Sequence, residues 1–106
     1  MQDEVKITEN GKNLIAALAC ELDHHTSRRV REEIDREIFA HRPELLVLDF
    51  TEVRFMDSSG IALIIGRVEV ARAVGATVRV TGLSPTLRRL VRLSGLEKIR
   101  ELTISA

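Results

Sequence analysis

The sequence has no tryptophan, no tyrosine and only one cysteine among its 106 residues. A single cysteine, Cys20, excludes a disulfide within the chain and is typical of a reducing compartment. We expect Cys20 to be a small apolar residue at the end of a strand rather than a reactive thiol. The longest apolar run, around 61–65, is far too short to span a bilayer, and residues 1–6 lack the apolar stretch of a secretory signal. We therefore expect a cytoplasmic protein with no membrane partner.

An excess of charge of either sign is also missing, because 16 basic residues balance 16 acidic ones. A balanced charge and only three phenylalanines argue against direct nucleic-acid binding, which needs a basic face or stacking aromatics. The charges are nevertheless unevenly placed: residues 1–57 carry 8 basic and 13 acidic residues, and residues 58–106 carry 8 and 3. This asymmetry either orients a protein partner or neutralises itself across the fold.

What the sequence does have is a regular alternation of strand and helix patterns within one domain, 1–106. We predict strands at 5–8, 14–20, 45–50, 77–80 and 99–104, a hairpin turn at 9–12, and helices from the cap residues 23–26 to about 41, at 58–74 and from 85 to about 94. Such an order predicts an α/β fold with a mixed, mostly parallel sheet of four to five strands and crossover helices.

The apolar residues of each predicted helix indicate which side is buried. Val30, Ile34 and Ile38 recur every four residues in the first helix, and Leu87, Leu90 and Leu93 form a stripe in the third. The first half of the second helix is apolar nearly all round, so we expect it to be buried on more than one side.

The most informative motif is Asp57-Ser58-Ser59-Gly60, which lies where a buried strand gives way to the second helix. Hydroxyls at a helix N-terminus either cap the helix or receive a phosphate, because the free N–H groups there favour anions. Asp57 is either the cap residue or a group that orients the serine or contacts a partner. The physics of the sequence does not separate Ser58 from Ser59.

Three motifs together resemble one known family. Phe55 to Gly60 is similar to the signature of the anti-sigma-factor antagonists, Glu21 to Thr26 resembles their second signature, and Ser84-Pro85 with Leu93 to Ile99 resembles the third. The resemblance covers the whole chain in register and identifies it as a single STAS domain, closest to the sporulation members of that family. The chain departs from the family at Cys20, where glycine is usual, and ends at Ala106, where the closest members continue into a final helix.

The resemblance implies a non-enzymatic switch with no catalytic residue, metal or cofactor. The unphosphorylated form would bind an anti-sigma factor that is also a serine kinase and brings the ATP, and would thereby free a sigma factor. Phosphorylation of Ser58, with Ser59 as the alternative, would end that binding, and a PP2C-type phosphatase would reset the switch. The expected partner-binding residues are Asp23, His24, His25, Thr26, Asp57, Ser58, Ser59 and Gly60.

Other functions were weighed against this one. Ser58 with a histidine and an aspartate has the residue types of a hydrolase triad, but the Gly-x-Ser-x-Gly spacing is missing. A metal site would need Cys20, His24, His25 and His41, although adjacent histidines rarely reach one ion. No phosphate-binding glycine loop is present for nucleotide. The same fold as a binding module in a stress-signalling or transport assembly is the main alternative.

A cluster of arginines on the third predicted helix was weighed separately. Arg88, Arg89 and Arg92 either attract a phosphate or an acidic partner, or form a solvated helix face.

Overall fold

The computed structural model describes residues 4–105, which build a five-stranded sheet with the strand order β1-β2-β3-β4-β5. The strands are β1 (Val5–Asn10), β2 (Asn13–Leu18), β3 (Leu45–Asp49), β4 (Thr77–Thr81) and β5 (Leu102–Ile104). The helices are α1 (His24–His41), α2 (Ser58–Ala73) and α3 (Pro85–Ser94), followed by the 3-10 turn η1 (Leu96–Lys98).

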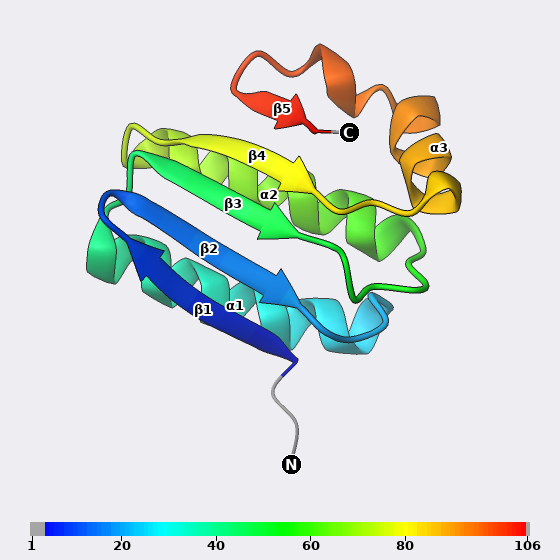
Figure 1. Ribbon diagram of the computed structural model, residues 1–106, viewed down its shortest axis with the longest axis horizontal. Coiled ribbons are helices and arrows are strands. Elements are labelled where there is room, and N and C mark those ends of the chain that lie inside the picture. Colours follow the sequence, from blue (N-terminus) through cyan, green and yellow to red (C-terminus); the bar gives the residue numbers. More distant parts are fainter. Residues whose placement is uncertain (1–3, 106) are drawn as a thin grey trace.

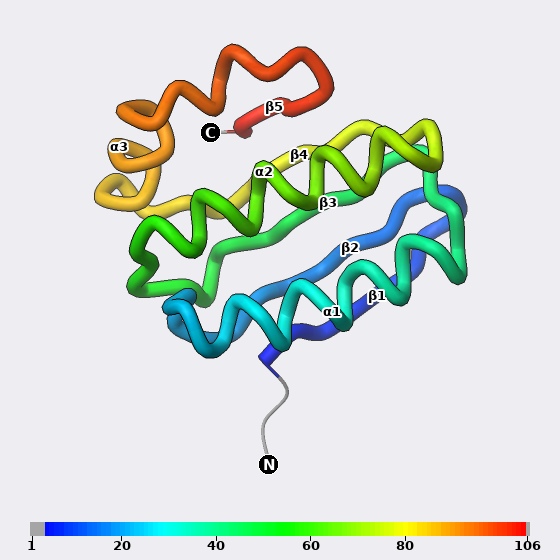
Figure 2. The backbone as a smooth tube through the Cα atoms, turned by 180° about the vertical axis from the view of Figure 1, so that it is seen from behind, coloured from blue at the N-terminus to red at the C-terminus, as the bar shows by residue number. Residues whose placement is uncertain are grey.

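The sheet is mixed and mostly parallel. β1 pairs with β2 as an antiparallel hairpin, whereas β2, β3, β4 and β5 run parallel to one another. Helices α1 and α2 lie side by side on one face of the sheet, and α3 lies beyond the end of β4 (Figures 1 and 2). Within residues 4–105 no helix covers the opposite face (Figure 1). The α/β fold predicted from the sequence is therefore confirmed.

The core lies between the sheet and the α1–α2 pair. Burial alternates along β2 and β3, as expected when one face of each strand points at the helices. The predicted stripe of α1 is confirmed, because Val30, Ile34 and Ile38 are fully buried against this face. Since β2 and β3 are parallel, the loops that lead into α1 and α2 leave the sheet at the same edge.

Two predicted boundaries at the hairpin were wrong by a few residues. The strands extend to Asn10 and start again at Asn13, so the turn consists of Gly11 and Lys12 alone. Gly11 has a φ of 62°, which is the left-handed conformation that such tight hairpin turns require. β2 ends at Leu18, so Cys20 lies in the following loop. Burial raises the pKa of Cys20 to about 11, which keeps the thiol protonated at neutral pH.

Two predictions about helix burial were also wrong. In α3 the buried residues are Leu87 and Val91, whereas Leu93 is 77% exposed, because this short helix packs along one narrow face only. In α2 the apolar first half is not buried all round. Leu63 and Ile64 face the core, but Ala62 is exposed and Ile65 is 38% exposed. The side of α2 that faces away from the sheet is thus an apolar surface.

Gly82 and Gly75 offer a test of how tightly the ends of β3 and β4 pack. Both have a left-handed φ, 74° and 79°, so Gly→Ala at either position costs about 1 kcal/mol in backbone strain. A Cβ at Gly82 would also lie 2.7 Å from the backbone nitrogen of Thr51 and 2.8 Å from Asp49 Oδ1, whereas one at Gly75 would meet nothing within 4 Å. We expect Gly82→Ala to lower the free energy of unfolding by about 1–3 kcal/mol more than Gly75→Ala does, as measured by urea denaturation. Equal losses would show that the packing at Gly82 is loose.

Candidate functional site

The loops after β2 and β3 are joined by backbone hydrogen bonds beyond the ends of the strands. The N–H of Leu22 donates to the carbonyl of Phe55 over 3.0 Å, and the N–H of Asp57 donates to the carbonyl of Leu22 over 3.2 Å. These bonds make an isolated parallel bridge between Leu22 and Met56, both of which are buried. The structure therefore brings the loop before α1 and the loop before α2 together, as the sequence motifs predicted.

The loop before α1 is built around Asp23. Its carboxylate accepts hydrogen bonds from the N–H groups of His25 and Thr26, both over 2.9 Å, and the Asp23 N–H donates back to Thr26 Oγ1 over 3.2 Å. The N–H of Thr26 is the main cause that holds the pKa of Asp23 below its usual value. Thr26 also donates its hydroxyl to the carbonyl of Glu21. Asp23 and Thr26 thus shape the turn, and they leave the exposed His24 and His25 on its outside.

Asp57 starts α2 in the same way. Its carboxylate accepts the N–H of Ser59 over 2.7 Å, which makes it the N-cap of the helix. Gly60 is required at its position by space rather than by backbone conformation, since an added Cβ would lie 2.7 Å from Met56 Sδ. The motif therefore combines a cap with a close approach, and it fixes Ser58 and Ser59 as the first two residues of the helix.

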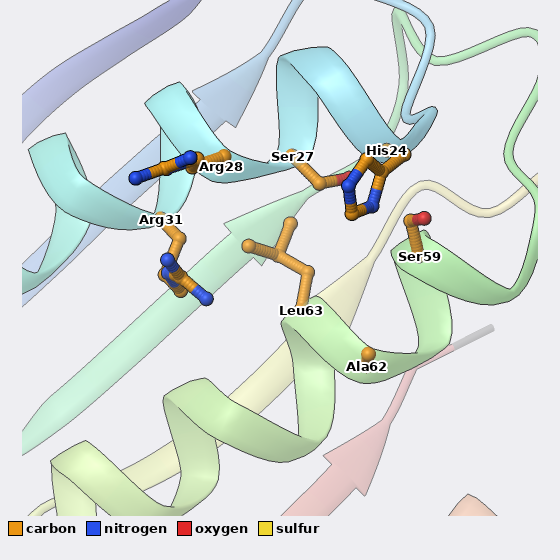
Figure 3. A pocket seen from close by; sticks show the side chains of 7 residues that line it. All are labelled: His24, Ser27, Arg28, Arg31, Ser59, Ala62 and Leu63. Carbon is orange, nitrogen blue, oxygen red and sulfur yellow. The ribbon is translucent and has the colours of Figure 1, made fainter.

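The two serines face different surroundings, because successive residues of a helix point about 100° apart. Ser58 is exposed and lines an apolar groove between α2 and α3, whose other lining residues are Ile61, Ala62, Ile65, Leu90, Leu93 and Ser94. Ser59 is half-buried and lines a second pocket, between α1 and α2, together with His24, Ser27, Arg28, Arg31, Ala62 and Leu63 (Figure 3). The sequence motif alone did not reveal this difference.

The apolar groove is the part of the site that sequence reasoning missed. Its members Ile65 and Leu93 are two of the large apolar side chains that the described part of the chain leaves exposed, and Phe55 in the neighbouring loop is another. Clustered exposed apolar residues are typical of a binding surface. The signal was present in the all-round apolar pattern of 61–65 and in the leucine stripe of α3, but both were interpreted as core.

The arrangements that the alternative functions need are not found among residues 4–105. No hydrogen bond joins Ser58 to a histidine there, and the carboxylates of Asp23 and Asp57 accept backbone N–H groups at the two caps. No group of three or more His, Cys, Asp or Glu side chains in that range is placed to hold a metal ion. In the same part of the chain, no helix has the length and apolar character to cross a membrane.

The arginines of α3 are largely engaged within the fold. Arg88 donates to the carbonyl of Ser105 over 2.6 Å, and Arg92 lies 3.6 Å from the carboxylate of Glu97. Arg89 is exposed. This cluster fits the solvated-face interpretation better than a binding site.

The fold and the site together define a class of protein. The profile of the STAS domain matches residues 4–105, and the chain belongs to the STAS domain family. It is 37% identical over 99 residues to the anti-sigma F factor antagonist of Paenibacillus polymyxa, which covers 93% of this chain and 85% of that protein.

Solved structures agree with this relationship. The anti-sigma factor antagonist SpoIIAA in its unphosphorylated form is 28% identical and has a TM-score of 0.79, over 96% of this chain and 88% of that one. The Bacillus cell fate determinant SpoIIAA in the phosphorylated form is also 28% identical, with a TM-score of 0.72 over 96% and 91%.

The cap role of Asp57 can be tested by removing its carboxylate. We expect Asp57→Ala to lower the free energy of unfolding by about 1 kcal/mol, because the N–H of Ser59 loses its partner. Asp57→Asn keeps an accepting oxygen in the same place and should stay within about 0.5 kcal/mol of the parent. Urea denaturation followed by circular dichroism measures both. A stability of Asp57→Ala equal to that of the parent would contradict the cap assignment.

Proposed function

We propose that this chain is an anti-sigma-factor antagonist that works by partner switching in the cytoplasm. The unphosphorylated form binds an anti-sigma factor that is also a serine kinase, and so frees the sigma factor. Phosphorylation of Ser58 ends the binding, and a PP2C-type phosphatase restores it. The observation that carries the proposal is the position of Ser58, which is exposed at the start of α2 and on the rim of an apolar groove.

The proposed partner surface combines the two loops with the groove. It contains Asp23, His24, His25, Thr26, Asp57, Ser58, Ser59 and Gly60, extended by Phe55, Ile61, Ile65, Leu90 and Leu93. The groove supplies the affinity, since apolar area removed from water is worth about 25 cal/mol per Å². The exposed histidines at the start of α1 supply polar contacts next to it. In this role residues 1–106 act as one STAS domain and carry out no catalysis themselves.

The switch follows from where the phosphate is placed. A phosphate on Ser58 adds a charge of about −1.5 to −2, and the N-terminus of α2 stabilises it by roughly 0.3–1 kcal/mol. The modification therefore does not melt the helix. In the complex, however, the same phosphate lies beside an apolar groove that a partner must cover, and an unpaired charge buried there costs several kcal/mol. Binding is lost while the fold is kept.

The surroundings of the two serines favour Ser58 as the phosphoacceptor. Ser58 is exposed, so a kinase that brings ATP can reach its hydroxyl. Ser59 is half-buried, and a phosphate there would lie beside His24, Arg28 and Arg31, which would neutralise it. A modification that is neutralised within the fold would repel a partner much less.

Substitutions at Ser58 test the switch directly. We expect Ser58→Ala to bind the cognate kinase and to accept no phosphate from radiolabelled ATP. Ser58→Asp should bind at least tenfold more weakly, a loss of about 1.4 kcal/mol or more, because a carboxylate then lies beside the groove. Ser59→Ala is the control and should be labelled and bound like the parent. Isothermal titration calorimetry gives the affinities, and phosphopeptide mapping gives the labelled residue. Label on Ser59 alone, or equal binding by Ser58→Ala and Ser58→Asp, would contradict the assignment.

A second substitution tests the groove apart from the phosphate. We expect Leu93→Ala to weaken kinase binding by about tenfold, with a free energy of unfolding within about 0.5 kcal/mol of the parent because Leu93 is exposed. Phe39→Ala is the matched control, since Phe39 is also exposed but lies near the C-terminal end of α1, away from the groove. If Phe39→Ala weakened binding as much as Leu93→Ala, the docking surface would not be the groove.

A further inference from the structure

The pocket between α1 and α2 has a composition that the proposed switch does not explain. Its lining residues on α1 are His24, Ser27, Arg28 and Arg31, whose spacing of three or four residues places them on one side of the helix. Figure 3 shows these side chains on the side of α1 that faces α2, with Ser59, Ala62 and Leu63 on the facing helix. Two of the seven residues carry a permanent positive charge, and none is acidic.

Ser27 is the unusual member of this set. Its side chain is only 8% exposed, and its hydroxyl oxygen is buried without a hydrogen-bond partner. A buried hydroxyl that lacks a partner costs about 1–3 kcal/mol, so proteins rarely leave one unsatisfied. In Figure 3 the oxygen points from α1 toward the ring of His24, that is, into the pocket. The geometry therefore indicates a group that would accept a hydrogen bond from Ser27.

The charges around the pocket favour an anion. Arg28 has one carboxylate nearby, Glu32 at 3.6 Å, but both side chains are largely exposed and the pair is weak. Arg31 makes no ion pair within residues 4–105, and it lies close enough to Arg67 to help lower the pKa of that group, which burial lowers most. The pocket also includes the first residue of α1 and the second of α2, where unpaired N–H groups attract negative charge.

We propose that this pocket binds a tetrahedral oxyanion of the phosphate class. Arg28 and Arg31 provide charge-assisted hydrogen bonds, and the hydroxyls of Ser27 and Ser59 donate to the remaining oxygens. Ala62 and Leu63 form an apolar wall on the α2 side. Free inorganic phosphate and the terminal phosphate of a nucleotide share this chemistry, so the test includes both.

The test is a titration of the ¹⁵N-labelled chain followed by NMR at constant pH and ionic strength. The probes are sodium phosphate, ADP and ATP, with sodium chloride as the reference. We expect saturable shifts of the amides of Ser27, Arg31 and Ser59 with phosphate. Shifts at those amides with ADP or ATP but not with inorganic phosphate would also support the pocket and would identify a nucleotide as the source. No saturable shift there with any of the probes would overturn the proposal.

Matched variants assign the binding to particular residues. We expect Arg31→Gln to weaken phosphate binding about tenfold, and Ser27→Ala to weaken it without lowering the melting temperature measured in the absence of phosphate. Arg36→Gln removes the same charge from an exposed position of α1 outside the pocket, and Arg89→Gln does so on α3; both should bind like the parent. A larger loss in Arg89→Gln than in Arg31→Gln would place the anion on α3 and overturn the proposal.

Discussion

The short parallel bridge between Leu22 and Met56 is the constraint on which the rest of the site depends. It continues the pairing of β2 and β3 past the ends of both strands. The next residue after each bridge partner is a helix cap, Asp23 for α1 and Asp57 for α2. The bridge therefore sets where both helices begin relative to one another. Because its side chains are buried, it is held by packing as well as by backbone hydrogen bonds.

The first turn of α2 separates two chemically different surfaces. On one side Ser58 borders a groove of apolar side chains, and on the other Ser59 borders a pocket with two arginines and a histidine. Since the two serines are adjacent and share the same backbone, only the rotation of the helix distinguishes them. A negative charge is costly to cover on the first side and is neutralised on the second. The same chemical modification thus has opposite consequences at neighbouring residues.

The sequence was sufficient for the elements, the sheet and the pairing of the two loops, because periodicity, caps and turn residues act locally. It was not sufficient for the burial of α2, because an apolar pattern does not say which sides of a helix find a neighbour. α3 is ten residues long and uses Leu87 and Val91 for packing, which leaves Leu93 and Ile65 exposed. The roles of Ser58 and Ser59 depend on those same neighbours, so they too required the structure.

An ion pair between the two helices bears on how the switch can work. Arg67 of α2 is 3% exposed and its Nε lies 2.8 Å from Asp35 Oδ1 of α1, without the alignment of a hydrogen bond. Burial raises the pKa of Asp35 and lowers that of Arg67, and each charge opposes the shift of the other. Separating such a pair leaves a buried charge alone, which typically costs about 3–5 kcal/mol. A phosphate at Ser58 gains only roughly 0.3–1 kcal/mol from the helix terminus. That gain is too small to move α2 away from α1, so a switch at Ser58 has to act by local charge and bulk at the surface.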